Sequence, residues 1–238
     1  MTHIIQAWNQ PPHIVALQTS RFFQQEQCFN IHPNQSTPPP TDALVAEFNL
    51  PHTPQFMQQV HKNTVIEYRE PPKHQLSVKA DACFTRVPGV ICAVMTADCL
   101  PILMTDQSGT FVAAIHCGWR SLYANIIQKT IAAIKPQHEI MVWLGPCIQQ
   151  SQYEVDESFV SNYLKQHPDS FEAFTATVNK KSQANLYIMA ETQLKKLGIK
   201  SINKSNECTL LSRQYFSWRE NATPHRMSTM AWIQHPKR

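Results

Sequence analysis

Short runs of apolar residues, rich in β-branched and aromatic side chains, recur along the chain between polar or turn-forming segments. Runs of this length and composition are typical of buried strands, whereas amphipathic helices repeat their apolar positions every three or four residues. We therefore expect strands at Thr64–Tyr68, Val90–Met95, Phe111–His116, Ile140–Leu144 and Ser228–Ile233.

Helical spacing follows Ser121, which has the residue type of an N-cap. Pro136 cannot continue a helix and should end this one. The apolar face of the expected helix contains Tyr123, Ile126, Ile127, Thr130, Ile131 and Ile134.

Two more helices are indicated in the second half of the chain. Asp156 is a candidate N-cap for one of them, and the other spans Leu186–Leu197 and stops at Gly198, a typical C-cap residue. The inward face of the first contains Phe159, Val160, Tyr163 and Leu164. Strands and helices are therefore mixed along the sequence.

Prolines mark two irregular connections. Four of them lie within Asn30–Thr41, and Pro71-Pro72 form a second break. Neither connection is long enough to separate two domains, and 238 residues fall within the size of one. We expect a single domain over residues 1–238.

Composition excludes several classes of protein. With 42% hydrophobic and 16% charged residues the chain resembles an ordinary globular protein. The net charge of +4 is spread over small clusters with no basic stripe, so we expect no nucleic-acid partner. No apolar run approaches the ~20 residues of a membrane span. Met1-Thr2-His3-Ile4 show no basic region leading into an apolar run, so we expect a protein that is not exported. The seven cysteines form no regular framework, so we expect a cytoplasmic protein with reduced thiols.

Common catalytic motifs are absent. The chain has only five glycines, and none forms GxGxxG or a phosphate-binding P-loop. It also lacks the GxSxG elbow of serine hydrolases and the HExxH helix of zinc proteases.

Three candidate metal ligands follow apolar runs that resemble strands. They are His61 after Phe56–Val60, Cys99 after Thr96-Ala97-Asp98, and His116 at the end of Phe111–His116. Imidazole and thiolate suit zinc or copper, and three ligands leave a fourth position open for catalysis. Their separation is far wider than in a zinc finger, so the residue types alone leave a surface histidine or a core cysteine as an open alternative.

A series of segments in fixed order decides between these interpretations. The segments are Gln59-Val60-His61-Lys62-Asn63, Ala80-Asp81-Ala82, Thr96-Ala97-Asp98-Cys99-Leu100-Pro101, Ala114-Ile115-His116-Cys117-Gly118-Trp119-Arg120, Leu144-Gly145-Pro146-Cys147-Ile148, Tyr153-Glu154-Val155, Cys208-Thr209 and Tyr215-Phe216-Ser217-Trp218-Arg219. With these segments, the chain from about Phe56 onward resembles the YfiH family, also described as laccase-domain or multicopper polyphenol oxidase-like proteins.

The resemblance implies a fold, a cofactor and an activity. The fold is α+β, a layered α/β sandwich with mixed β-sheets (YfiH/CNF-like). His61, Cys99 and His116 would bind the catalytic metal, zinc or alternatively copper. The implied substrates are small purine nucleosides and phosphate. The reactions are phosphorolysis of adenosine, inosine and methylthioadenosine to free base and ribose 1-phosphate, and deamination of adenosine. We expect a monomer or a weak homo-oligomer.

Further residues receive candidate roles. Cys99 and His116 are both ligands and catalytic candidates, and Asp81 and Asp98 could orient an imidazole, act as acid or base, or simply cap turns. Phosphate could be held by any of three arginines, Arg120, Arg219 and Arg226.

The remaining thiols and Trp119 are expected to be structural. Cys117 follows His116 on a strand and should point to the opposite face. Trp119 could lie in the core or in the pocket wall. Core positions are expected for Cys83, Cys92, Cys147 and Cys208.

The chain departs from the family pattern at three places. The segment Thr19–Leu50 lacks the glycine-rich opening, Asn185 stands where the family commonly has Asp, and Pro224-His225-Arg226 replaces Thr-Gly-Arg. A change of substrate preference is therefore open.

Three other functions compete with this one. A Cys99 thiolate activated by His116 could serve a cysteine hydrolase or a peptidoglycan-precursor editing enzyme without metal. A copper-dependent polyphenol oxidase is disfavoured because the sequence has no HxH pair. A binding module without catalysis is the third alternative, and it would not explain three metal ligands that leave a fourth position vacant.

Overall fold

The computed structural model describes residues 3–5, 8–22, 30–32 and 41–235. Its largest sheet has six strands in the order β12-β8-β6-β7-β4-β3. The outer pairs β12·β8 and β3·β4 are parallel and the inner pairs are antiparallel, so the sheet is mixed. Its strands are β3 (Val65–Tyr68), β4 (Ala82–Thr85), β6 (Leu100–Asp106), β7 (Val112–Cys117), β8 (Ile140–Leu144) and β12 (Ser201–Lys204).

A second sheet contains strands from both ends of the described chain. Its order is β1-β2-β13-β5, and all its pairs are antiparallel. The long strand β13 therefore lies between an early and a middle segment of the sequence. The strands are β1 (His3–Ile4), β2 (Ile14–Gln18), β5 (Cys92–Thr96) and β13 (Met227–Ile233).

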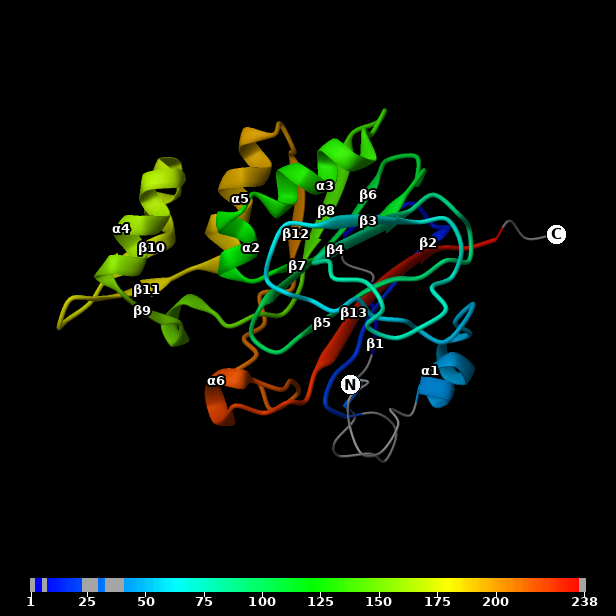
Figure 1. Ribbon diagram of the computed structural model, residues 1–238, viewed down its shortest axis with the longest axis horizontal. Helices are drawn as coiled ribbons and strands as arrows, with labels where there is room; N and C mark the ends of the chain where they lie inside the picture. The colour runs from blue at the N-terminus through cyan, green and yellow to red at the C-terminus, as the bar shows by residue number, and fades with distance from the viewer. Residues whose placement is uncertain (1–2, 6–7, 23–29, 33–40, 236–238) are drawn as a thin grey trace.

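The two sheets pack face to face, and helices cover their outer faces. Val94 and Ala231 of one sheet share a fully buried cluster with Leu103 and Ala114 of the other. On the far side of the larger sheet, α2 (Trp119–Tyr123), α3 (Ile126–Ile134) and α5 (Leu186–Lys196) bury their apolar faces against it. Leu44 of α1 (Thr41–Phe48) packs on the smaller sheet. Figure 1 shows α1 on one side of the sheets and the other three helices on the opposite side, which confirms the predicted layered sandwich with mixed sheets.

A small extension lies beside α5, at the left of Figure 1. Its three strands are antiparallel in the order β10-β11-β9. Tyr163 is buried in it, and Phe159 and Phe174 pack on that ring. The extension contains η1 (Gln150–Gln152), β9 (Glu154–Asp156), α4 (Glu157–Gln166), η2 (Pro168–Ala173), β10 (Phe174–Ala176) and β11 (Lys181–Ala184). The short helix α6 (Trp218–Asn221) is separate from it and lies between β12 and β13 in the sequence.

The five strands expected between Thr64 and Ile233 are present within one or two residues, as β3, β5, β7, β8 and β13, and β8 has the predicted bounds. Ser121 is not an N-cap, because it lies inside α2, and the predicted helix is two helices separated by Asn125 at φ 60°. The second of them ends at Ile134, before Pro136, as predicted. Its apolar face, Ile126, Ile127, Thr130 and Ile134, is buried.

The other two helices also lie where the sequence predicts them. Asp156 precedes α4, although its carboxylate pairs with Lys181 and makes no cap hydrogen bond. On the inward face Tyr163 is buried, while the three neighbours predicted with it are half-buried. Helix α5 ends one residue early at Lys196, and Gly198 follows at φ 79°, the left-handed conformation expected after a helix.

Pro71-Pro72 lie in the connection between β3 and β4. The connection expected over Asn30–Thr41 lies largely outside the described residues, and Thr41 already begins α1. Across the ranges that the structure covers, no helix is both long and apolar enough to span a membrane.

Candidate metal centre

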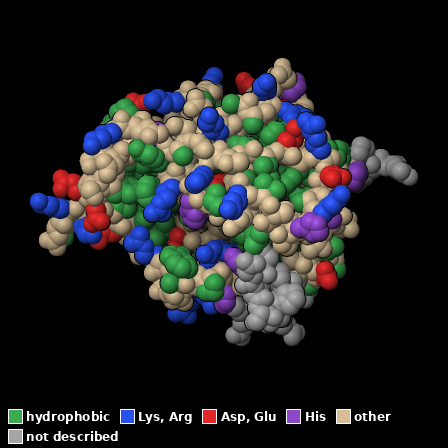
Figure 2. All heavy atoms as spheres, in the orientation of Figure 1, with side chains coloured by type: hydrophobic (Ala, Val, Ile, Leu, Met, Phe, Trp, Pro, Cys, Tyr) green, Lys and Arg blue, Asp and Glu red, His purple; other side chains and the backbone are tan. Residues whose placement is uncertain are grey.

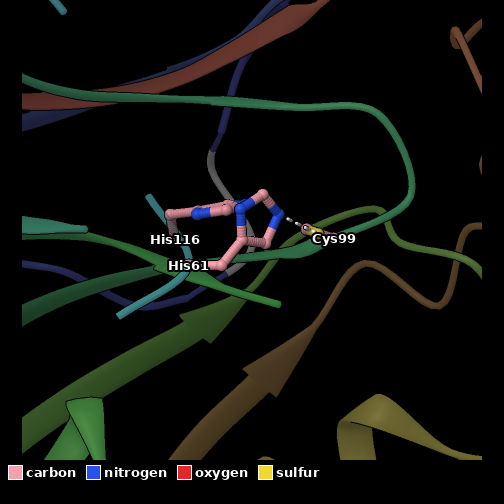
Figure 3. Close-up of side chains that lie close together, drawn as sticks. All are labelled: His61, Cys99 and His116. Atoms are coloured by element: carbon pink, nitrogen blue, oxygen red, sulfur yellow. Dashed lines mark hydrogen bonds between the residues drawn. The ribbon is translucent and has the colours of Figure 1, made fainter. Parts of the chain in front are cut away.

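His61, Cys99 and His116 come from three separate parts of the chain and converge at one point. One ligand atom from each side chain lies within 4.8 Å of the other two. The Cys99 sulfur is 3.8 Å from Nε2 of His61, and the two imidazole centroids are 4.7 Å apart at an interplanar angle of 78°. Figure 3 shows the two rings and the thiol pointing toward one another. Such a group of donors can hold a metal ion.

Each side chain reaches this point by a different route. His116 is the penultimate residue of β7, and Cys99 lies in the turn that carries the chain from β5 in one sheet to β6 in the other. His61 lies in a loop with φ 57°, so the expected strand before it is wrong. The side-chain amide of Gln59, rather than its backbone, makes sheet-like bonds to Met95, with two contacts of 2.7 Å.

Asp81 holds two of the candidate ligands in place. Its carboxylate is fully buried and accepts hydrogen bonds from the backbone N–H groups of His61 and Lys62, each at 2.8 Å, and from Nδ1 of His116 at 2.9 Å. Burial alone would raise the pKa of Asp81, but these hydrogen bonds hold it below the ordinary value. The bond to Nδ1 leaves Nε2 of His116 free to face the other two ligands.

The electrostatics favour a thiolate at Cys99. Burial opposes charge on both groups, yet the mutual attraction of Cys99 and His116 lowers the pKa of the thiol to about 6 and raises the pKa of the imidazole to about 9. The thiolate is the form of cysteine that binds metals and attacks substrates.

Gly118 leaves room for the ligands. A Cβ atom at this position would lie 3.0 Å from the Cys99 sulfur and 3.0 Å from Cδ2 of His61. The Gly118 backbone has φ −63°, which any residue can adopt. Glycine is therefore needed here for the space it leaves and not for its backbone conformation.

Asp98 lies beside the centre, but its carboxylate points toward the C-terminal segment. It accepts hydrogen bonds from the hydroxyls of Thr209 at 2.6 Å and Ser217 at 3.0 Å, and from the backbone N–H of Arg219 at 2.7 Å. Its φ is 82°. Among the described residues, the Asp98 carboxylate therefore has no hydrogen bond to either imidazole, and it ties the Cys99 turn to residues more than a hundred positions away.

The three candidate ligands open into a cavity of about 620 Å³. Figure 2 shows basic side chains gathered around a histidine near the middle of the visible face. The cavity has both polar and apolar walls. It is lined by His32, Gln58, Gln59, His61, Leu76, Met95, Thr96, Ala97, Asp98, Cys99, His116, Trp119, Arg120, Ile148, Tyr153, Leu186, Trp218, Arg219 and Arg226.

The three predicted arginines all reach this cavity, each over an aromatic ring. The guanidinium carbon of Arg120 lies 4.4 Å from the ring centroid of Trp119, that of Arg219 lies 5.5 Å from Tyr153, and that of Arg226 lies 5.6 Å from Trp218. These are cation–π distances that fix the planar groups at the cavity wall.

Trp119 combines the two roles left open by the sequence. It lines the cavity, and it also packs edge-on against Phe159 with ring centroids 4.7 Å apart.

The other cysteines occupy structural positions. Cys117 is buried on the helix-covered face of the larger sheet, opposite His116, and Cys83 and Cys92 are buried between the sheets. Cys147 is buried as well, whereas Cys208 is only half-buried and differs from the core position expected for it. All the described cysteines are free thiols.

Two departures from the family pattern have local explanations. Asn185 is the N-cap of α5 and accepts from the backbone N–H of Ile188 at 3.1 Å, which a carboxylate would also do. In the Pro224-His225-Arg226 segment, the guanidinium of Arg226 donates to the carbonyl oxygens of Thr223 and His225. The third departure, in Thr19–Leu50, lies partly outside the described residues.

Sequence reasoning assigned no role to several residues of this site. Gly118 and Tyr153 stand within the family segments, yet spacing gives no reason to select them. Trp218, 52% exposed at the cavity, also belongs to one of those segments. A large exposed aromatic residue is a signal only once its neighbours in space are known.

The fold and this centre define a class of α+β sandwich proteins with a candidate His-Cys-His metal site at the base of a cavity. The chain belongs to the family described as multi-copper polyphenol oxidoreductase laccase, whose model matches residues 40–234.

Individual relatives confirm the resemblance to YfiH proteins. A Shigella flexneri protein named purine nucleoside phosphorylase YfiH is 36% identical over 193 residues, 80% of this chain and 78% of the relative. A Haemophilus influenzae protein named purine nucleoside phosphorylase is 33% identical over 240 residues, 95% of this chain and 97% of that one. A crystal structure of a Neisseria meningitidis protein, 30% identical, superposes with a TM-score of 0.84 over 98% of this chain and 99% of its own. A Bacillus licheniformis YfiH structure, 19% identical, shares the fold with a TM-score of 0.83, over 98% of this chain and 96% of its own.

Proposed function

We propose that this chain is a metal-dependent enzyme that cleaves purine nucleosides with phosphate. Its substrates are adenosine, inosine and methylthioadenosine, its products are the free base and the ribose 1-phosphate derivative, and it also deaminates adenosine. The observation that carries the proposal is the convergence of His61, Cys99 and His116 on one point of a cavity of about 620 Å³. Cavities of roughly this size suit small-molecule ligands. The names of the relatives support the choice of substrate class.

The three side chains fit a metal ion by their chemistry. Cys99 favours the thiolate, and the bond from Nδ1 of His116 to Asp81 leaves the other ring nitrogen as a donor. We propose zinc, with copper as the alternative metal, held by these two residues and His61. With a fourth position open, such an ion supplies a Lewis acid next to the substrate.

The chain itself binds and orients the reactants. Apolar wall residues such as Ile148 and Leu186 give a purine ring a place outside water, and the arginines attract phosphate. In phosphorolysis a phosphate oxygen forms a bond to C1′ of the ribose while the bond from C1′ to N9 breaks. The electron pair of that bond leaves with the base, which takes up a proton.

Asp81 is proposed as a positioning residue for His61 and His116, since its carboxylate already accepts hydrogen bonds from both. Asp98 is proposed as a positioning residue as well, instead of an acid or base, because donors from Thr209, Ser217 and Arg219 occupy its carboxylate. Arg226 remains a candidate substrate contact in the wall. We further propose that residues 1–238 act as one domain, as a monomer or weak homo-oligomer in the cytoplasm, without a nucleic-acid partner.

One observation favours a second function. Cys99, His116 and Asp81 are arranged as nucleophile, base and orienting carboxylate, and the pKa of the thiol is already lowered to about 6. A cysteine hydrolase or a peptidoglycan-precursor editing enzyme would use this set. It would have no need for the His61 imidazole, whose Nε2 lies 3.8 Å from the sulfur.

Polyphenol oxidation, which the family description names, is the less favoured function. Several copper ions require several groups of ligands. Among the described residues, His61, Cys99 and His116 are the one group of at least three His, Cys, Asp or Glu side chains arranged for a metal.

The test combines metal analysis with product analysis. Wild type, His61→Ala and Cys99→Ala are purified, their metal content is measured, and each is incubated with adenosine with and without phosphate, separating adenine from inosine. We expect about one metal per wild-type chain, phosphate-dependent adenine, and loss of metal and products in both variants. His138→Ala, an exposed histidine outside the cavity, is the matched control. If His61→Ala retains full activity while Cys99→Ala loses it, the metal-free cysteine mechanism replaces this proposal.

A further inference from the structure

Tyr153 presents an unpartnered hydroxyl to the cavity. The residue is only 8% exposed and lines the same cavity as the candidate ligands. Its hydroxyl makes no hydrogen bond to any residue that the structure describes, whereas the buried hydroxyl of Tyr187 bonds to Gly145 and Ser205. Since no acceptor from the described residues occupies this hydroxyl, it can donate to a ligand that brings an acceptor into the cavity.

Two arginines line the cavity together with Tyr153. Within the described part of the chain, the side chains of Arg120 and Arg219 form no ion pair and no hydrogen bond. Arg219 stacks over the Tyr153 ring at 5.5 Å, and Arg120 over the adjacent wall residue Trp119 at 4.4 Å. Burial and the nearby Cys99 raise the pKa of Tyr153, while the charges of Arg219 and Arg120 lower it, so both charges act on the hydroxyl.

Arg226 differs from these two. Its guanidinium donates to two backbone carbonyl oxygens. Burial lowers the pKa of His32, and the charge of Arg226 lowers it further. Two donor contacts of Arg226 are therefore already made within its own loop.

We propose that Arg120, Arg219 and the Tyr153 hydroxyl form the subsite for inorganic phosphate, next to the metal-binding side chains. Two guanidinium groups can neutralise the dianion and donate in pairs to its oxygens, and the phenol adds a third donor from a buried position. That the anion is phosphate rests on the proposed function. Of the three arginines that the sequence leaves equivalent, this assignment selects Arg120 and Arg219 and leaves out Arg226.

The surrounding structure fixes this subsite relative to the reacting centre. Asp98 accepts the backbone N–H of Arg219 at 2.7 Å and is joined covalently to Cys99. The phosphate-binding arginine and the thiol are thereby anchored to the same short turn. Phosphate held here would lie close to a nucleoside bound in the cavity beside the three candidate ligands, as attack on its C1′ atom requires.

The test measures phosphate binding directly in the metal-loaded protein. Inorganic phosphate is titrated by calorimetry into wild type, Tyr153→Phe, Arg219→Ala and Arg120→Ala, with Arg213→Ala as the control that removes an exposed arginine outside the cavity. We expect Kd for phosphate to rise about tenfold in Tyr153→Phe and about ten- to a hundredfold in either arginine variant, with no change in Arg213→Ala. Thermal unfolding and metal content verify that each variant is folded and loaded.

Steady-state kinetics provide the second readout. KM for phosphate should rise in the three variants while KM for the nucleoside stays within about twofold. Unchanged phosphate affinity in Tyr153→Phe and both arginine variants would overturn the assignment. If adenosine monophosphate binds with this dependence on the variants and inorganic phosphate does not bind, the subsite belongs to a nucleotide and the assignment is overturned as well. If no nucleoside is cleaved but phosphate binding still depends on these residues, the subsite stands and the proposed reaction fails.

Discussion

Asp81 and His116 are joined twice. The backbone N–H of His116 donates to the carbonyl oxygen of Asp81 at 2.7 Å, and the Nδ1 atom of the same histidine bonds to the Asp81 carboxylate at 2.9 Å. Both residues lie at the ends of paired segments around β4 and β7, so the sheet itself sets their spacing. The ring orientation is thus fixed by main-chain geometry as well as by one side chain.

This relationship predicts the result of Asp81→Asn. The variant keeps the size of the side chain but loses the negative charge that balances the ligand imidazole, so metal affinity should fall about ten- to a hundredfold. Competition with a fluorescent zinc chelator measures the change. Asp169→Asn, at an exposed aspartate outside the cavity, serves as the control. Equal zinc affinity in wild type and Asp81→Asn would refute the positioning role.

Metal removal should lower the thermal stability. A metal at one hundred times its Kd stabilises the folded state by about 2.7 kcal/mol, and a chain of this size shifts its Tm by roughly 2–4 °C per kcal/mol. We expect chelation to lower the Tm of the wild type by about 5–10 °C. In His61→Ala, chelation should have no such effect. A chelator-dependent shift of the same size in His61→Ala would mean that the metal binds elsewhere.

Gly118→Ala tests how tightly the ligands are packed. The new methyl group would lie 3.0 Å from both the Cys99 sulfur and the His61 ring, closer than van der Waals contact, so metal binding should weaken about tenfold or more. Gly198→Ala is the reverse control. It meets no atom within 4 Å but sits at φ 79°, so it should lower the free energy of unfolding by about 1 kcal/mol without changing metal affinity.

Asp98→Asn tests the anchor of the C-terminal segment. The amide keeps one acceptor oxygen but turns an NH₂ group toward one of the three donors that the carboxylate now accepts. We expect the free energy of unfolding in urea to fall by about 1–3 kcal/mol, with metal content retained. Asp42→Asn, an exposed residue of α1, should change stability by less than about 0.5 kcal/mol. Loss of the metal with unchanged stability would instead assign Asp98 to the centre.

Local pattern was sufficient for many elements of the fold. The helix face around Ile127 and the strand Ile140–Leu144 were predicted because their apolar periodicity matches their burial. Strand β6 was missed because Pro101 argues against a strand. The structure tolerates this proline near the start of β6, before the ladder with β8 begins at Ile102. Its carbonyl accepts the backbone N–H of Gly145 at 2.9 Å, and the Gly145 carbonyl accepts from the Tyr187 hydroxyl, so no N–H is required from residue 101.

The candidate site was less accessible to sequence reasoning. The residue types at positions 61, 99 and 116 indicated metal chemistry, but their convergence depends on contacts between loops and two different sheets. The sequence left Asp98 open between orienting an imidazole, acting as acid or base, and capping a turn, and its three hydrogen-bond partners lie 111 to 121 positions later. No local pattern encodes such long-range partners, so only the folded arrangement separates a catalytic carboxylate from an anchoring one.

The position of β13 has a consequence for synthesis of the chain. In its sheet β5 has one strand neighbour, β13, and β13 is also the strand that connects β5 to β2. The ribosome adds Met227–Ile233 long after β2 and β5, so the backbone edges of β2 and β5 stay without this partner until β13 has been made. During that interval they are open to pairing with other nascent chains, and a chaperone that covers exposed strand edges would improve the yield of native protein.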